Sequence, residues 1–153
     1  MQATDSAVRR EIVVNATPER AFEVFTDGFD SWWPRTHKIG AAELAKAVID
    51  PESMRWYELG MDGSRCDWGA ILAYEPPRRL LLEWRIGGQW GFETDPAAVS
   101  EIDVTFTPEG DATRVTLEHR NLDRHTAPDE LKSAVGSEGG WPGLLQRYSE
   151  AVG

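Results

Sequence analysis

The sequence predicts an α+β fold in which a curved antiparallel sheet of about seven strands packs around a long C-terminal helix. Three observations predict it: a strand and two short helices open the chain, about six strands separated by turns follow, and an apolar helical stripe closes it. A sheet of this size twists and curls, so a helix across its concave face leaves a gap unless large side chains fill it. We expect one domain over residues 1–153.

The opening elements follow from a β-branched run and a helix-capping signal. The segment VRREIVV, residues 8–14, is typical of a strand. Thr17 can cap the free amides of the next helix, and Pro18 suits its first position because proline has no amide to leave unpaired. Gly28 ends this helix, and a shorter helical segment follows. That segment carries Phe29, Trp32 and Trp33.

From about residue 44 the pattern changes to strands separated by turn residues. The turn signals are Asp50-Pro51, Asp62-Gly63, Pro76-Pro77 and Gly110-Asp111. Asp62-Gly63 predicts a tight two-residue hairpin, because both residues tolerate positive φ. Every second residue is apolar in LLLEWRI, EIDVTFT and TRVTLEH. One face of the sheet is therefore predicted to be apolar and the other to face water.

The last 27 residues predict two helical stretches separated by glycines at 136, 139 and 140. In the final stretch the apolar residues fall at helical spacing and form one stripe. These residues are Trp141, Leu144, Leu145, Tyr148 and Val152. The apolar face of the sheet is the surface available to bury them.

Composition excludes several classes of partner. The chain has 16 basic and 26 acidic residues, a formal charge of −10, so nucleic acid and anionic membrane surfaces would be repelled. Cys66 is the only cysteine, which excludes an intrachain disulfide and favours a reducing compartment. No apolar run reaches the length of a membrane span, and the N-terminus does not resemble a signal peptide. We therefore expect a cytoplasmic protein.

The order and spacing of several motifs resemble a known family. The segment YELGMDGSRCDWGAILAYEPPRRLLLEW, residues 57–84, is similar to the pattern of the activator of heat-shock-protein-90 ATPase homologue family, a branch of the START-like or SRPBCC superfamily. GGWPGLLQRY, residues 139–148, resembles its last helix, and TPERAFEVFTD with WWP resembles its beginning. The resemblance implies a helix-grip fold enclosing an apolar cavity. Members of the superfamily bind lipids, sterols, polyketides or plant hormones, and some are polyketide cyclases or aromatases.

No motif for catalysis, metal or cofactor binding is present. The sequence lacks a metal-ligand helix, a P-loop, a dinucleotide fingerprint and a serine elbow, so we predict no catalytic residue, no metal and no cofactor. Cys66 could pair with His119 or His125 as nucleophile and base, but no spacing brings them together. His37 could sense pH or contact a ligand, but its polar loop favours an ordinary solvated position.

The carboxylates of the sheet divide into two groups. Glu83, Glu101, Asp103 and Glu118 alternate onto the polar face beside arginines, which favours a charge-paired surface over an acid–base cluster. Glu58 shares the face of Trp56 and so can point inward, where a carboxylate needs a partner. It is predicted either to orient a ligand or to reach water at a strand end.

The aromatic residues carry the main functional prediction. The tryptophans are interpreted either as core filler or as the lining of a pocket. A core made mainly of leucine and valine could fill the same space, and indole or phenol edges could offer hydrogen bonds inside an apolar pocket, so pocket lining is favoured. The predicted ligand-binding residues are Trp33, Trp56, Glu58, Trp68, Leu82, Trp84, Val104, Phe106, Leu117, Trp141, Leu144 and Tyr148. Of the adjacent pair, Trp33 is placed in the pocket and Trp32 in the core or an interface. Trp90 and Phe92, in the glycine-bearing segment 87–98, are predicted to form a lid.

Three functions remain open from the sequence. The first is binding of a small hydrophobic or aromatic molecule in the internal cavity. The second is a protein-interaction module that presents an acidic surface to a chaperone or another partner. The third is an enzyme of the polyketide cyclase or aromatase kind, in which one or two polar groups of the cavity move protons. A weak homodimer through exposed aromatic residues such as Trp32 is a further possibility.

Overall fold

The computed structural model describes residues 7–153 except Gln89 and Pro96. Residues 1–6 of the predicted domain and two positions of the predicted lid segment therefore lie outside the described part. The described elements, in chain order, are β1 Val8–Val14, α1 Pro18–Thr26, α2 Phe29–Trp32, β2 Leu44–Asp50, β3 Arg55–Gly60, β4 Arg65–Glu75, β5 Arg79–Trp84, β6 Ser100–Glu109, β7 Ala112–Arg120, the 3₁₀ turn η1 Leu122–Arg124, α3 Pro128–Val135 and α4 Trp141–Val152.

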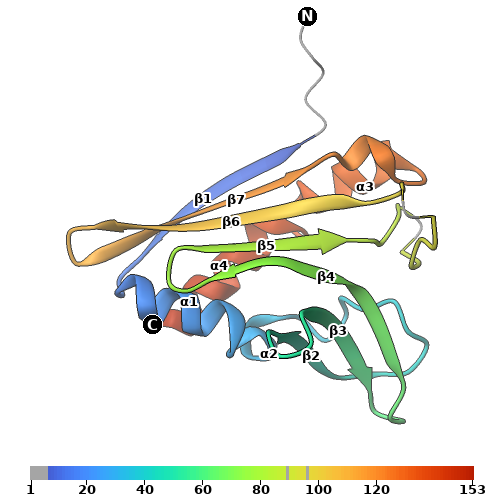
Figure 1. Ribbon diagram of the computed structural model, residues 1–153, viewed down its shortest axis with the longest axis horizontal. Coiled ribbons are helices and arrows are strands. Elements are labelled where there is room, and N and C mark those ends of the chain that lie inside the picture. The colour runs from blue at the N-terminus through green and yellow to red at the C-terminus, as the bar shows by residue number, and fades with distance from the viewer. Residues whose placement is uncertain (1–6, 89, 96) are drawn as a thin grey trace, which may run out of the picture.

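The seven strands form one antiparallel sheet in the order β1-β7-β6-β5-β4-β3-β2. All neighbours except β1 and β7 are consecutive in sequence, so the middle of the chain is a meander of hairpins. Figure 1 shows β4 bending so that the β2–β3 end of the sheet curls away from β6 and β7. The predicted helix-grip fold of about seven strands is confirmed.

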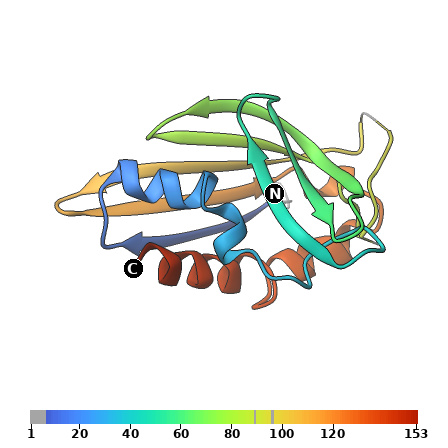
Figure 2. The same ribbon diagram turned by 90° about the horizontal axis from the view of Figure 1, so that it is seen from below.

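The helices α1, α2 and α4 lie together on the concave side of the sheet (Figures 1 and 2). The 12-residue helix α4 runs beside β1 and α1, and its apolar stripe is buried as predicted. Thr17 caps α1, its hydroxyl accepting a hydrogen bond from the Arg20 amide at 3.2 Å. Among the described residues, no helix has the length and apolarity to span a membrane.

The alternation of the sheet places its two faces as predicted. The inward residues of β5, β6 and β7 are almost fully buried; they include Leu80, Leu82, Ile102, Val104, Val115 and Leu117. On the outer face, Arg79 donates two hydrogen bonds of 3.0 Å to Asp103, and Arg120 pairs with Glu101 and Asp103. Glu101, Asp103 and Glu118 are therefore charge-paired as predicted, whereas Glu83 accepts a hydrogen bond from the Ala70 amide. Such exposed pairs contribute little to stability individually.

Two local expectations need correction. The turn at Asp62-Gly63 is wider than a two-residue hairpin: β3 ends at Gly60, β4 begins at Arg65, and of the two central residues only Gly63 has positive φ. The Asp62 carboxylate instead accepts hydrogen bonds from the amide and hydroxyl of Ser64. Trp32 is not an exposed aromatic residue, because its side chain is 1% exposed and its indole N–H donates to the Val24 carbonyl.

Candidate functional site

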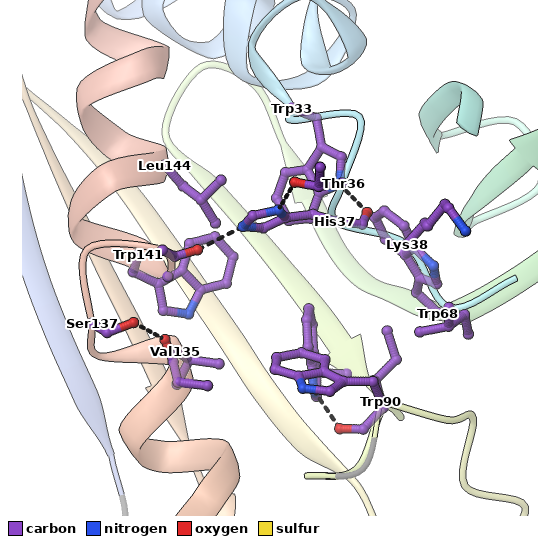
Figure 3. Close-up of a pocket in the computed structure, with 16 residues that line it drawn as sticks. Trp33, Thr36, His37, Lys38, Trp68, Trp90, Val135, Ser137, Trp141 and Leu144 are labelled. Carbon is purple, nitrogen blue, oxygen red and sulfur yellow. Dashed lines mark hydrogen bonds between the residues drawn. The ribbon is translucent and has the colours of Figure 1, made fainter. Parts of the chain in front are cut away.

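A cavity of about 450 Å³ lies between the start of α4 and the curled part of the sheet. Its wall comes from the segment after α2, from β4 and β5, from the segment between β5 and β6, and from α3, the turn after it and the first turn of α4. Cavities of this size are typical of small-molecule sites in proteins. Figure 3 shows the lining side chains converging on this space from these separate parts of the chain.

Five of the twelve predicted ligand-binding residues line this cavity. They are Trp33, Trp68, Trp84, Trp141 and Leu144. The indoles surround the space at close range: the rings of Trp33 and Trp68 are 5.3 Å apart, and those of Trp33 and Trp141 are 6.4 Å apart. The wall is therefore mainly aromatic surface, which suits a flat apolar molecule.

The other seven predicted residues lie in the core behind or beside the cavity, and none of them forms its wall. They are Trp56, Glu58, Leu82, Val104, Phe106, Leu117 and Tyr148. All seven point inward as the alternation predicts. They miss the cavity because α1, the middle of α4 and neighbouring rings fill the space in front of them: Phe25, for example, packs 5.2 Å from Tyr148 and 5.8 Å from Phe106.

The indole N–H groups of the four buried wall tryptophans are all hydrogen-bonded within the protein. Trp33 donates to the carbonyl of His37 at 2.8 Å, and Trp84 to the carbonyl of Ile86 at 2.7 Å. Trp68 donates to a carboxylate oxygen of Glu58, and Trp141 to the ring of His119. The expectation that these indole edges offer hydrogen bonds to a ligand is wrong. The four indoles present apolar ring surface with their polar atoms turned away.

Glu58 is buried and points inward, and its hydrogen bonds explain why it does not face the cavity. One carboxylate oxygen accepts from the Ile39 amide at 2.6 Å and from Trp68 at 2.9 Å, and the other accepts from the Gly40 amide at 3.1 Å. Glu58 thus holds both the segment after α2 and one indole of the wall. Cys66, its neighbour on β4, has a pKa raised by burial and by the negative charge of Glu58.

Polar groups reach the cavity mainly from the segment after α2. His37 lines it between Trp33 and Trp141 (Figure 3), and its Nε2 donates to the Gly139 carbonyl at 2.6 Å. Because a carbonyl only accepts, the proton lies on Nε2, and Nδ1 accepts from the Thr36 hydroxyl at 3.1 Å. The ammonium of Lys38 donates to the Gly40 carbonyl. His37 therefore places an imidazole ring in the cavity wall.

The two predicted lid residues differ in position. Trp90 lines the cavity, is 47% exposed, and has a left-handed backbone with φ of 61°. A tight turn, in which the Trp90 amide donates to the Gly87 carbonyl, directs it across the cavity from Trp141 (Figure 3). Phe92 does not line the cavity; its ring packs under the guanidinium of Arg85.

A buried hydrogen-bond network, here called the imidazole network, begins at the cavity wall. It consists of Trp141, His119, Ser100, His125 and Glu93. Trp141 Nε1 lies 3.0 Å from His119 Nδ1, and His119 Nε2 lies 2.8 Å from Ser100 Oγ. Ser100 Oγ lies 2.7 Å from His125 Nε2, and His125 Nδ1 lies 2.6 Å from a Glu93 oxygen. Neither sequence periodicity nor any local motif indicated this network.

The electrostatics of the network keep both imidazoles neutral and Glu93 charged. Burial, with a smaller contribution from the charge of His125, lowers the pKa of His119 to about 3. Burial also lowers the pKa of His125, and Glu93 offsets this only in part. Burial would raise the pKa of Glu93, but hydrogen bonds from Thr126 and His125 outweigh it and lower that pKa.

The Glu93–His125–Ser100 part has the order of a hydrolase triad but not its accessibility. The Ser100 side chain belongs to a residue with no exposed surface, and Ser100 does not line the cavity. Its oxygen is within hydrogen-bond distance of both imidazoles. A nucleophile must reach its substrate, so this serine does not form a catalytic site in the described structure.

No metal site was predicted, and among the described residues no three histidine, cysteine or carboxylate side chains are grouped as they would need to be to hold a metal ion. Cys66 lies on β4 beside Glu58, whereas His119 and His125 meet at Ser100, so the three residues weighed as nucleophile and base do not come together.

The fold and the cavity together define a START-like helix-grip domain with an aromatic internal cavity. The model of the family described as activator of Hsp90 ATPase homolog 1-like protein matches residues 15–153. The chain belongs to this family, as the motif resemblance predicted. No match is found among the curated proteins.

Two solved structures are similar over nearly the whole chain. One is Txn09, an anthrahydroquino-γ-pyrone synthase complexed with SUM. It is 38% identical to this chain, the match covers 95% of this chain and 96% of that chain, and the TM-score is 0.65. The other is CalC from Micromonospora echinospora, a self-sacrificing resistance protein. It is 34% identical to this chain, the match covers 97% of this chain and 94% of that chain, and the TM-score is 0.68. Protein MLL2253 from Mesorhizobium loti, at 22% identity, 95% and 96% coverage and TM-score 0.64, supports the fold alone.

Proposed function

We propose that the protein binds a small, flat hydrophobic molecule, of the polycyclic aromatic kind, in the cavity at the start of α4. The observation that carries the proposal is the wall itself: four buried indoles enclose a space of about 450 Å³. Because their N–H groups are occupied, selection would depend on ring stacking and shape rather than on indole hydrogen bonds.

The proposal includes a partial cover for the ligand. Trp90 lines the mouth with 47% of its surface exposed, so a bound aromatic molecule would bury more of it. Burial of one further aromatic face adds to affinity without a new polar contact. Equal quenching of Trp90 by an aqueous quencher with and without ligand would count against this cover.

The matched variants Trp68→Phe and Trp56→Phe test the site. Both indoles are buried, both donate one hydrogen bond, and their rings are 5.2 Å apart, but only Trp68 lines the cavity. We expect Trp68→Phe to weaken binding of a neutral polycyclic aromatic probe by about two- to tenfold, since aromatic pairs contribute about 0.5–1.5 kcal/mol. Trp56→Phe should change it less than about twofold.

Isothermal titration calorimetry provides the measurement, with a saturated fatty acid as the comparison ligand. A fatty acid that binds as well as the aromatic probes contradicts the aromatic selectivity. If none of these ligands binds, or if the two variants weaken binding equally, the cavity is not the binding site. Native mass spectrometry of freshly purified protein would in addition show whether a compound is retained from the host.

A second candidate function is a cyclase-like enzyme that acts on a polyketide in the same cavity. The relative at 38% identity, an anthrahydroquino-γ-pyrone synthase, favours it, as does the imidazole of His37 in the wall. In this case the Thr36 hydroxyl would turn away from His37 Nδ1, and Nδ1 would accept a proton from the bound substrate. Turnover that is lost in His37→Gln while probe binding persists would support catalysis; turnover unchanged in that variant would exclude this role of His37.

The remaining expectations stay predictions. We infer one domain over residues 1–153. Contact with a chaperone or with a second copy of the chain stays a prediction that rests on the acidic composition, and its strength should fall with added salt.

A further inference from the structure

The imidazole network has a fixed direction, because one of its ends can only donate. An indole N–H has no acceptor function, so His119 Nδ1 accepts the hydrogen bond from Trp141. The neutral ring of His119 then carries its proton on Nε2 and donates to Ser100. Ser100 in turn donates to His125 Nε2, and His125 donates from Nδ1 to Glu93. The two imidazoles therefore hold opposite tautomers.

His119, Ser100 and His125 make their described side-chain hydrogen bonds only to neighbours in the network, whereas Glu93 also accepts from Thr126. His119 and Ser100 have no exposed surface, and His125 is 4% exposed. The ionisable group that acts on His119 is His125, and the one that acts on His125 is Glu93. The aromatic rings beside His119 are those of Trp84 and Trp141, whose centres are 5.2 and 6.0 Å from its own. A buried hydroxyl that loses its acceptor must find another one or remain unsatisfied at a cost of about 1–3 kcal/mol.

A proton added at one end must therefore change the other end. When His125 Nε2 takes up a proton from solvent, it becomes a donor to Ser100, and the hydroxyl of Ser100 needs a different acceptor. The only other ring nitrogen within hydrogen-bond distance is His119 Nε2 at 2.8 Å. It can accept only if His119 carries its proton on Nδ1 instead, by exchange with solvent. The N–H of Trp141 then faces a second donor at 3.0 Å, and the hydrogen bond is lost.

We propose that His119, Ser100, His125 and Glu93 are positioning residues for Trp141, and that uptake of one proton at His125 reverses the network and releases the indole of Trp141 from its place in the cavity wall. Glu93 belongs to the same segment as Trp90, and the Gly88 amide of that segment donates to the Thr126 carbonyl beside His125. The network thus links two walls of the cavity. The part of this inference that concerns regulation of ligand binding rests on the proposed function. The part that concerns the position of the Trp141 indole does not.

The experiment is an NMR titration of the unmodified protein without ligand. Long-range ¹H–¹⁵N correlations of the histidine rings give the tautomers, and Trp141→Phe assigns the indole N–H signal. At neutral pH we expect His119 protonated on Nε2 and His125 on Nδ1. On stepwise acidification the Trp141 indole proton should move upfield, as for an N–H that loses its acceptor, with the same midpoint as His125.

Two variants separate positioning from general packing. In Ser100→Ala the connection is missing, so His125 should still titrate while the Trp141 signal no longer follows it. Thr126→Val is the matched control: it removes the hydroxyl that donates to Glu93 but keeps the amide donor and every member of the network, so the Trp141 signal should continue to follow His125.

Three results would overturn the inference. They are equal tautomers of the two histidines, an indole signal of Trp141 that stays unchanged while His125 titrates, and a His125 that remains neutral until the protein unfolds in acid. Because the titration contains no ligand, each of these results leaves the proposed binding function standing. Conversely, failure of every probe to bind leaves the titration result unaffected.

Discussion

The two ends of the interface between α4 and the sheet have similar side chains but differ in how they are packed. At the C-terminal end of α4, Tyr148 packs edge-to-face on Phe25, and Phe25 on Phe106, with ring centres 5.2 and 5.8 Å apart. At the N-terminal end, Trp141 is 6.4 Å from both Trp33 and Trp84, and a cavity of about 450 Å³ remains.

The difference arises from what lies opposite the sheet. At the filled end, the phenyl rings of α1 insert between α4 and the strands. At the cavity end, α1 and α2 have ended, and the segment after α2 contributes one indole, Trp33, together with the smaller or polar residues Thr36, His37, Lys38 and Ile39. Aromatic content alone therefore does not determine whether space is filled; the elements that deliver the rings do.

The largest expected effect is a loss of stability when the packing at the C-terminal end of α4 is disrupted. Phe25→Ala removes a ring that contacts Trp32, Phe106 and Tyr148, and should lower the free energy of unfolding by about 3–5 kcal/mol. Urea denaturation measures this loss. Because Phe25 does not line the cavity, the affinity for an aromatic probe should change less than about twofold while the variant is folded. A stability loss below about 1 kcal/mol would contradict tight packing at this end.

An intermediate effect is the loss of stability at acid pH that the buried His119 near the cavity causes. The pKa of His119 is about 3 in the folded state against 6.5 for a free imidazole, so the unfolded chain takes up the proton first. The contribution of His119 to stability is thus constant above about pH 6.5 and falls between 6.5 and 3 as the pH is lowered. At pH 5 the loss is about 2 kcal/mol, at 1.36 kcal/mol per pH unit.

Urea unfolding at neutral and acid pH checks this sign and slope. The variant His119→Gln provides the comparison, since it lacks the titrating ring and should show a flatter dependence over the same range, whatever its stability at neutral pH. If wild type and variant lose stability in parallel, the buried neutral imidazole is not the cause.

The smallest expected effect compares two neighbouring leucines of α4. Leu144 lines the cavity, whereas Leu145 is 2% exposed in the core. Leu144→Trp can place its ring in free space, so we expect a change in stability below about 1 kcal/mol and loss of probe binding. Leu145→Trp must displace packed atoms and should cost about 1–3 kcal/mol while binding persists. Thermal unfolding and calorimetry measure both; equal costs in the two variants would mean that the cavity is closed in solution.

Most of the fold was predictable because its signals are local. The β-branched run Val8–Val14 predicted β1 with the bounds observed, and the capping pair Thr17-Pro18 predicted the start of α1, which ends at Thr26, two residues before Gly28. Alternation assigned the buried faces of β5 to β7 correctly, and the glycines after Val135 separated α3 from α4. The hairpin at Asp62-Gly63 differed because the side chain of Asp62 formed hydrogen bonds to Ser64 that dipeptide preference does not include.

The site was predictable only in part, for a geometric reason. Alternation shows that Trp56, Trp84 and Phe106 all point inward. It does not show which element packs opposite each of them. The direction of a side chain repeats every two residues, whereas filling depends on the element packed opposite. Trp84 meets the cavity, and Phe106 meets the rings of α1.

The sequence by itself determined the order of the elements and the inward direction of the strand and α4 aromatic residues, because these depend on local propensity and periodicity. Its motifs, by their resemblance, indicated the family. Only the tertiary structure decided which indoles enclose the cavity and where their N–H groups are bound. It also brought Glu93, Ser100, His119, His125 and Trp141 together from separate segments of the chain. Contacts between residues far apart in sequence depend on how the sheet curls around α4, and a single sequence pattern does not contain that curvature.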